Sequence, residues 1–175
     1  MQAIYINWHG PFLYENIATG KFCDDEFHEY LSGYGHYAIT GMTPRQRIAR
    51  MQYLGITEQL YKQRFSDKSH KIHLVTRKRE LWLGKIVYPK KVARKTLEDA
   101  EYMLIYFNDE AVLCERKTQN APKVDCAVIS HFFKKGSFEQ RHNLPAIVRM
   151  IPEVMTWDTE LRALRYCSRM KNLQL

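Results

Sequence analysis

The sequence lacks the features that would place the protein in a membrane or in an oxidising compartment. No apolar run approaches the roughly 20 residues that a membrane-spanning helix needs. The N-terminus has no basic segment leading into an apolar one, so we expect no secretory signal. The four cysteines are widely separated and form no CxxC pair, which disfavours a zinc knuckle and a disulfide framework. We therefore expect a cytoplasmic protein with reduced thiols and no membrane partner.

Size and charge narrow the class of protein further. The chain has 175 residues, of which 45% are hydrophobic, so residues 1–175 can form a single domain with a sizeable core. Its net charge is +8 and its isoelectric point is about 9.3. An excess of positive charge favours a polyanionic partner such as nucleic acid, although many basic proteins bind none.

The pattern of apolar residues and turn formers predicts an α+β fold with a small mixed or antiparallel sheet flanked by helices. Strands are expected over residues 4–8, 36–40, 50–55, 81–88 and 127–133, with a turn directly after the first of them, at residues 9–11. Helices are expected over residues 24–31, 57–65, 96–107 and 158–170, the second capped by Thr57 and the third opened by a capping box at Thr96.

Two short tyrosine-glycine motifs lie on the second and third expected strands. They are Gly35-His36-Tyr37 and Tyr53-Leu54-Gly55, and they would face each other in a hairpin. A helix carrying Arg64 follows the second motif, and a later helix carries Glu101. Tyrosine, arginine and a carboxylate supply a proton acceptor, a cation for phosphate and a metal ligand, which metal-assisted phosphodiester cleavage requires.

Glu101 is the most informative single residue in this set. On a helical wheel it lies between Leu97 and Ile105, within an apolar arc. Burial of a carboxylate on such a face is costly unless the group is paired or bound to a metal. The alternative is a structural salt bridge between Glu101 and a core arginine or lysine.

Arg64 and the two tyrosines each have a functional and a structural interpretation. The planar guanidinium of Arg64 suits phosphate, but an arginine stem also commonly covers apolar surface. Tyr37 and Tyr53 could serve in catalysis or simply pack in the sheet. Since the unperturbed phenol pKa is about 10, a basic tyrosine would need nearby cations or metal, and Arg64 and Lys68 are the candidates.

Further basic residues around the expected central strand could meet a phosphate backbone, although each alone is consistent with solvated surface. The nucleic-acid-binding set would comprise Arg64, Lys68, Lys71, Arg77, Lys78 and Arg79. His70, in the loop after Arg64, is a further candidate for proton transfer near neutral pH.

In order and spacing, residues 35–118 resemble the GIY-YIG nuclease family, with residues 1–34 and 119–175 as extensions packed on that core. The resemblance implies an endonuclease that hydrolyses phosphodiester bonds, in DNA rather than RNA, with one Mg²⁺ or Mn²⁺ and no small-molecule cofactor. Tyr37, Tyr53, Arg64 and Glu101 would form the site, Glu101 binding the metal.

The sequence departs from the family pattern in three places. His36 stands where an apolar residue is usual, and the two motifs are further apart than in compact members. Cys114 falls where the family commonly has an asparagine. This last departure favours an alternative, a catalytically weakened or inactive nuclease-fold module that binds nucleic acid. A domain that binds an acidic protein through its basic surface is a third hypothesis.

Overall fold

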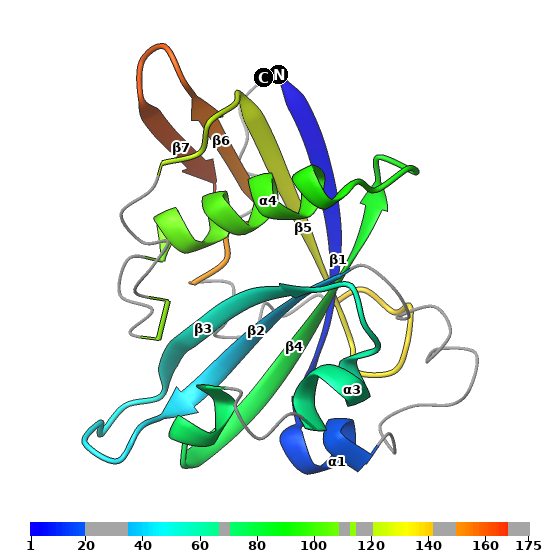
Figure 1. Cartoon of the computed structure of the whole chain (residues 1–175), viewed down its shortest axis with the longest axis vertical. Coiled ribbons are helices and arrows are strands. Elements are labelled where there is room, and N and C mark those ends of the chain that lie inside the picture. Colours follow the sequence, from blue (N-terminus) through cyan, green and yellow to red (C-terminus); the bar gives the residue numbers. More distant parts are fainter. Residues whose placement is uncertain (20–34, 67–70, 109–112, 115–120, 142–149, 168–175) are drawn as a thin grey trace.

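A seven-stranded mixed sheet forms the centre of the molecule, with strand order β3-β2-β4-β1-β5-β6-β7 (Figure 1). The computed structural model describes residues 1–19, 35–66, 71–108, 113–114, 121–141 and 150–167. Its strands are β1 (Gln2–Leu13), β2 (Gly35–Met42), β3 (Arg50–Thr57), β4 (Arg77–Tyr88), β5 (Cys126–Phe133), β6 (Val154–Asp158) and β7 (Ala163–Cys167). Its helices are α1 (Tyr14–Thr19), α3 (Tyr61–Ser66), the 3-10 helix η1 (Lys71–Leu74) and α4 (Arg94–Phe107). The predicted α+β class is confirmed.

The helices cover opposite faces of the sheet. Helix α4 packs Leu97 and Leu104 against Ile4, Ile6 and Trp8 in one apolar cluster. Helices α1 and α3 lie with η1 over a second cluster, to which strand β2 contributes every other side chain. Successive residues of a strand point to opposite faces, which is why neighbouring β2 residues belong to different clusters. No described helix has the length and apolar character needed to cross a membrane.

The predicted hairpin is present as strands β2 and β3, which pair antiparallel. Tyr37 lies opposite Gly55, and Ile39 lies opposite Tyr53. The two motif tyrosines are therefore diagonal neighbours on the same sheet face. Strand β2 also pairs antiparallel with β4, whereas β1 pairs parallel with β5. The strands outside residues 35–118 extend the same sheet.

The first predicted turn is wrong, because β1 continues through residues 9–11 to Leu13. Its pairing with β4 is irregular between His9 and Phe12, and Gly10 there has a φ of 156°. An irregularity of this kind accommodates a glycine and a proline without ending a strand, provided that both flanks pair. Here residues on both sides of the break pair with β4.

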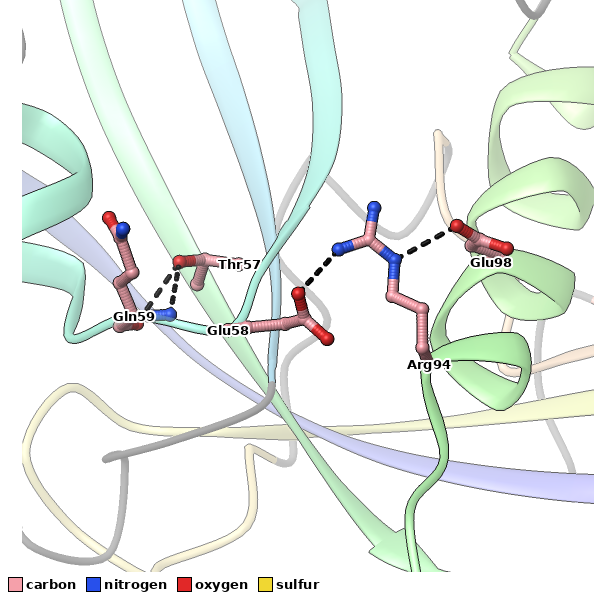
Figure 2. A network of polar contacts seen from close by, with 5 residues as sticks. All are labelled: Thr57, Glu58, Gln59, Arg94 and Glu98. Carbon is pink, nitrogen blue, oxygen red and sulfur yellow. Dashed lines mark hydrogen bonds and ion pairs between the residues drawn. The ribbon is translucent and has the colours of Figure 1, made fainter.

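The starts of two helices differ from the sequence predictions. Helix α3 begins at Tyr61, and the hydroxyl oxygen of Thr57 instead accepts a hydrogen bond from the Gln59 amide at 3.0 Å, forming a turn (Figure 2). Helix α4 begins at Arg94, so Thr96 lies inside it and the predicted capping box is wrong. The predicted ends, near residues 65 and 107, are confirmed.

The predicted C-terminal helix over residues 158–170 is wrong, because this segment contributes to the β6–β7 hairpin. The Asp158 carboxylate accepts a hydrogen bond from the Leu161 amide at 2.9 Å and orders the connecting turn. A helical pattern is overridden here because β6 can pair with β5 and bury Met155 and Trp157. The helix predicted over residues 24–31 lies outside the described residues, as do residues 168–170.

Candidate functional site

Tyr37 and Arg64 form the centre of the candidate site. The Tyr37 side chain is fully buried on β2, and its hydroxyl oxygen accepts hydrogen bonds from Arg64 Nε at 3.2 Å and Nη2 at 3.1 Å. The amide of Arg64 bonds to the Leu60 carbonyl, and the residue lies in the last turn of the short helix α3. Because Nε and Nη2 both bond to a single oxygen, the orientation of the guanidinium plane is fixed.

Tyr53 stacks on Tyr37 from the neighbouring strand. Their ring centroids are 5.9 Å apart and the ring planes differ by 18°. The Tyr37 hydroxyl also donates a hydrogen bond to the Tyr53 hydroxyl, which continues the chain of bonds that starts at Arg64. The described structure therefore brings three of the four predicted catalytic residues into one hydrogen-bonded group.

The glycine of the second motif is needed for this stacking. A Cβ atom at Gly55 would lie 2.6 Å from the Tyr37 hydroxyl oxygen and 2.7 Å from Cε1 of Tyr53. Separations below 3.0 Å are essentially never adopted by real Cβ atoms. Gly55 thus leaves the space across which the two tyrosines meet.

The other two residues of the first motif hold the flanking helices in place. A Cβ atom at Gly35 would overlap the hydroxyl of Tyr61. That hydroxyl, on α3, lies 2.9 Å from the His36 carbonyl oxygen and donates to it. On the opposite face, Nε2 of the buried His36 ring donates to the Leu97 carbonyl of α4 at 3.0 Å. His36 therefore positions α4, a role that the sequence motif did not indicate.

Glu101 lies on α4, and its side chain is only 4% exposed. Burial as predicted from the apolar arc is confirmed. Burial, together with the neighbouring Cys114 and Glu101 groups, raises the pKa of the Tyr53 phenol above its usual value. The Glu101 carboxylate is therefore within electrostatic reach of Tyr53, which connects it to the group formed by Tyr37 and Arg64.

Cys114 lies on the outer edge of β3, beside the same tyrosine. Its Sγ atom accepts a hydrogen bond from the Leu54 amide at 3.2 Å and lies 3.5 Å from the Leu54 carbonyl oxygen. The Leu113 amide bonds to the Gln52 carbonyl oxygen at 3.1 Å. Residues 113–114 thus satisfy backbone groups of β3, which is one of the two edge strands of the described sheet.

Both phenols of the site are neutral near pH 7. Burial is the main reason that the pKa of Tyr37 lies far above its usual value, and the positive charge of Arg64 offsets only part of this effect. The pKa of Tyr53 is likewise raised, chiefly by burial. Removal of water outweighs the nearby cation because a charged phenolate loses most of its solvation in the interior.

The other basic residues of the prediction that the structure describes do not join this group. His70 and Lys68 lie outside the described residues. Lys71 is exposed, and its Nζ atom donates to the Leu113 carbonyl at 2.8 Å, next to Cys114. Lys71 therefore contacts the chain segment that lies beside the site, although it does not contact the site residues themselves.

The three basic residues at the start of β4 differ in their contacts. Arg77 donates to the Gln46 carbonyl in the β2–β3 turn at 2.5 Å. Arg79 forms an ion pair with Glu15 at 2.7 Å, whereas Lys78 is exposed. Arg77 and Arg79 thus brace the turn and α1 respectively.

Arg94 forms ion pairs on both sides and connects the chain segments that lead into the two site helices. Its Nη1 atom lies 2.6 Å from Glu58 Oε2, just before α3, and its Nε atom lies 2.9 Å from Glu98 Oε1 on α4 (Figure 2). The three side chains are 40% to 54% exposed, so water screens the pairs. We expect them to contribute little to stability.

No family model, curated protein or solved structure matches the chain. The functional proposal therefore depends on the geometry of the site and on the motif resemblance.

Proposed function

We propose that this chain is a metal-dependent endonuclease of the GIY-YIG type that hydrolyses phosphodiester bonds, with DNA favoured over RNA as substrate. The observation that carries the proposal is the bonded group of Tyr37, Tyr53 and Arg64, with the buried Glu101 of α4 close enough to contribute to the raised pKa of Tyr53. Tyr37, Tyr53 and Arg64 come from three separate elements, β2, β3 and α3, and a purely packing role does not require their polar groups to meet. The antiparallel β3-β2-β4 segment, with a helix on each face, supports the same assignment.

Arg64 would stabilise negative charge on the scissile phosphate. A guanidinium has five N–H donors in a rigid plane and stays protonated at any physiological pH. The Tyr37 hydroxyl sets the orientation of that plane before substrate arrives. A preorganised donor is worth more to catalysis than one that must reorient during the reaction.

Glu101 would be the protein ligand of one Mg²⁺ or Mn²⁺. Mg²⁺ is typically held by one or two carboxylates together with water and substrate phosphates, so a single buried glutamate fits its chemistry. The residues that the structure describes contain no group of three or more acidic, histidine or cysteine side chains that would make an all-protein cage. When bound, the ion would polarise the phosphate and lower the pKa of its water.

The tyrosines would orient the attacking water. A neutral phenol both accepts and donates a hydrogen bond, and Tyr53 accepts one from Tyr37. Because burial keeps both phenols protonated, either would act as a proton acceptor only once positive charge in the site lowered its pKa. In the protein without substrate, both tyrosines would therefore be uncharged, and their role would be to keep the neighbouring groups in position.

Nicking of supercoiled plasmid DNA tests this function. Purified protein should convert the supercoiled form to the nicked form with Mg²⁺ or Mn²⁺, and EDTA should stop the reaction. Arg64→Lys keeps the charge but loses the planar fork of donors, so it should lose most of the activity, as should Arg64→Ala. Absence of metal-dependent cleavage on plasmid, single-stranded and branched DNA alike would refute the proposal.

Cys114 favours a second candidate function, a nuclease-fold module that holds nucleic acid without cutting it. Its thiol stands where the family resemblance expects an amide, and it bonds to the backbone of Leu54. DNA binding that weakens steeply with salt, without cleavage in any metal, would select this alternative.

A further inference from the structure

The sheet face opposite α4 carries exposed aromatic side chains on strands β4 and β1, with the half-buried ring of His131 beside them on β5. Tyr88 is 51% exposed and Tyr5 is 38% exposed. Tyr5 lies opposite Tyr88 of β4 on one side and opposite Ile129 of β5 on the other. On the α4 face the neighbouring β1 positions, Ile4 and Ile6, are fully buried. Large exposed aromatics side by side on a sheet are unusual in a surface that only meets water.

Three of these rings form a continuous aromatic row, made of Tyr88, Tyr5 and His131. The Tyr5 and Tyr88 ring centroids are 5.4 Å apart with the planes tilted by 48°. Tyr5 and His131 are 6.4 Å apart with their planes only 27° from parallel. The row therefore presents ring faces and edges over three adjacent strands of the same sheet.

Small side chains lie next to the aromatic row, and two basic side chains lie on the same sheet face. Next to the aromatic row, the paired residues Ala3, Ala127 and Thr156 run across strands β1, β5 and β6. Their side chains are small, so they do not project beyond the aromatic rings. Strand alternation places Lys85, opposite Asn7, and Arg165, opposite Thr156, on this same face.

Charge on this face favours an anion. Among the strand residues that the structure describes, Asp158 is the one acidic side chain that alternation places on this face, and its Oδ1 atom accepts the Leu161 amide at 2.9 Å. Asp125, directly before β5, accepts the Thr159 amide at 2.7 Å. The whole chain carries a net charge of +8. Cations and aromatic rings on one open surface suit a ligand with alternating negative charge and flat apolar rings.

We propose that the aromatic row is a stacking platform for unpaired bases of single-stranded nucleic acid, with Lys85 next to the row and Arg165 further along the same face, on β7, for the phosphates. Single strands fit better than duplex, because bases in a duplex are already stacked and show only their edges. The platform rests on the proposed function in one respect only, which is that nucleic acid is the ligand in both cases. It requires no cleavage, and it contains none of Tyr37, Tyr53, Arg64 and Glu101.

Binding in EDTA tests the platform without any contribution from catalysis. A fluorescein-labelled single-stranded oligonucleotide and the matching duplex are titrated with full-length protein at several salt concentrations. The double variant Tyr5→Ala/Tyr88→Ala should bind the single strand at least about tenfold more weakly, since base–aromatic stacking contributes substantially per base. Its affinity for the duplex should change by less than about twofold.

Tyr166→Ala is the matched control. Tyr166 is 61% exposed, but it lies on the opposite sheet face, where its ring packs 4.9 Å from that of Phe107 on α4. This variant should bind the single strand as wild type does. Tyr5→Phe/Tyr88→Phe keeps both rings and should also bind normally, which separates stacking from loss of a hydroxyl or of folding.

Photocrosslinking gives a second measurement that does not depend on substitutions. A single strand containing 5-iodouracil should crosslink to wild-type protein at peptides containing Tyr5, Tyr88 or His131. Equal single-strand affinity of wild type and Tyr5→Ala/Tyr88→Ala, or crosslinks confined to other peptides, would overturn the platform. Cleavage without single-strand binding would refute the stacking platform but not the nuclease proposal. Single-strand binding without cleavage would refute the nuclease proposal but not the platform.

Discussion

The hydroxyl oxygen of Tyr37 accepts hydrogen bonds from both Nε and Nη2 of Arg64, at 3.2 and 3.1 Å. This relationship connects strand β2, which carries the first motif, to helix α3, which follows the second motif. It fixes a cationic side chain that is otherwise long and mobile, and such prior fixing reduces the entropy lost when a phosphate binds.

Tyr37→Phe removes the acceptor of both bonds while keeping the ring packing. The unfolding free energy should fall by about 1–3 kcal/mol, because the Arg64 donors lose their partner in a largely buried place. Plasmid nicking should fall at least about tenfold, since the guanidinium plane is no longer held. Tyr14→Phe, which loses a bond to the Phe65 carbonyl outside the group, is the control and should keep its nicking rate.

Stability above pH 10 should depend on Tyr37. Burial holds the pKa of this phenol above its unfolded value of about 10, so the folded state keeps a proton that the unfolded state releases. This contribution is complete below pH 10 and is lost as the pH rises further. Denaturant unfolding from pH 8 to 11 should show wild type losing stability more steeply than Tyr37→Phe, by up to about 1.4 kcal/mol per pH unit. Parallel curves would contradict the burial of an ionisable Tyr37.

Gly55→Ala should disrupt the site through steric overlap. The added methyl would meet both Tyr37 and Tyr53, and overpacking of this kind typically costs about 1–3 kcal/mol. Plasmid nicking by Gly55→Ala should fall by more than the decrease in the fraction of folded protein explains. Gly136→Ala is a suitable control, because Gly136 has a φ of 63° but no atom within 4 Å of the added Cβ. It should lose about 1 kcal/mol from backbone strain and retain nicking.

Cys114 can be exchanged for the residue that the family resemblance expects. Cys114→Asn supplies an amide donor and acceptor for the Leu54 backbone, so it should keep wild-type stability and increase nicking severalfold. Cys114→Ala removes both contacts and should lower the unfolding free energy by about 1 kcal/mol. Identical nicking by wild type, Cys114→Asn and Cys114→Ala would show that this position does not support catalysis.

Local patterns predicted the central elements of the site. Alternation and turn formers indicated the β2–β3 hairpin, and the apolar arc around Glu101 indicated its burial. Both features follow from short-range periodicity, which the sequence displays directly.

Features that depend on partners distant in the sequence were missed. The C-terminal segment forms the β6–β7 hairpin because β5 offers an edge to pair with, although its pattern favours a helix. The bond from His36 to the Leu97 carbonyl joins residues 61 positions apart, and no local motif indicates it. The requirement for glycine at position 55 becomes visible only once the Tyr37 ring is placed across it.

Nicking of supercoiled plasmid by Glu101→Gln tests the central claim most directly. This substitution removes the charge needed for metal binding with little change in size, and Glu98→Gln on the exposed side of the same helix is the matched control. With Mg²⁺ or Mn²⁺, we predict nicking by wild type and Glu98→Gln, and a loss of at least about a hundredfold in Glu101→Gln. Nicking by Glu101→Gln at the wild-type rate would contradict the proposed nuclease site.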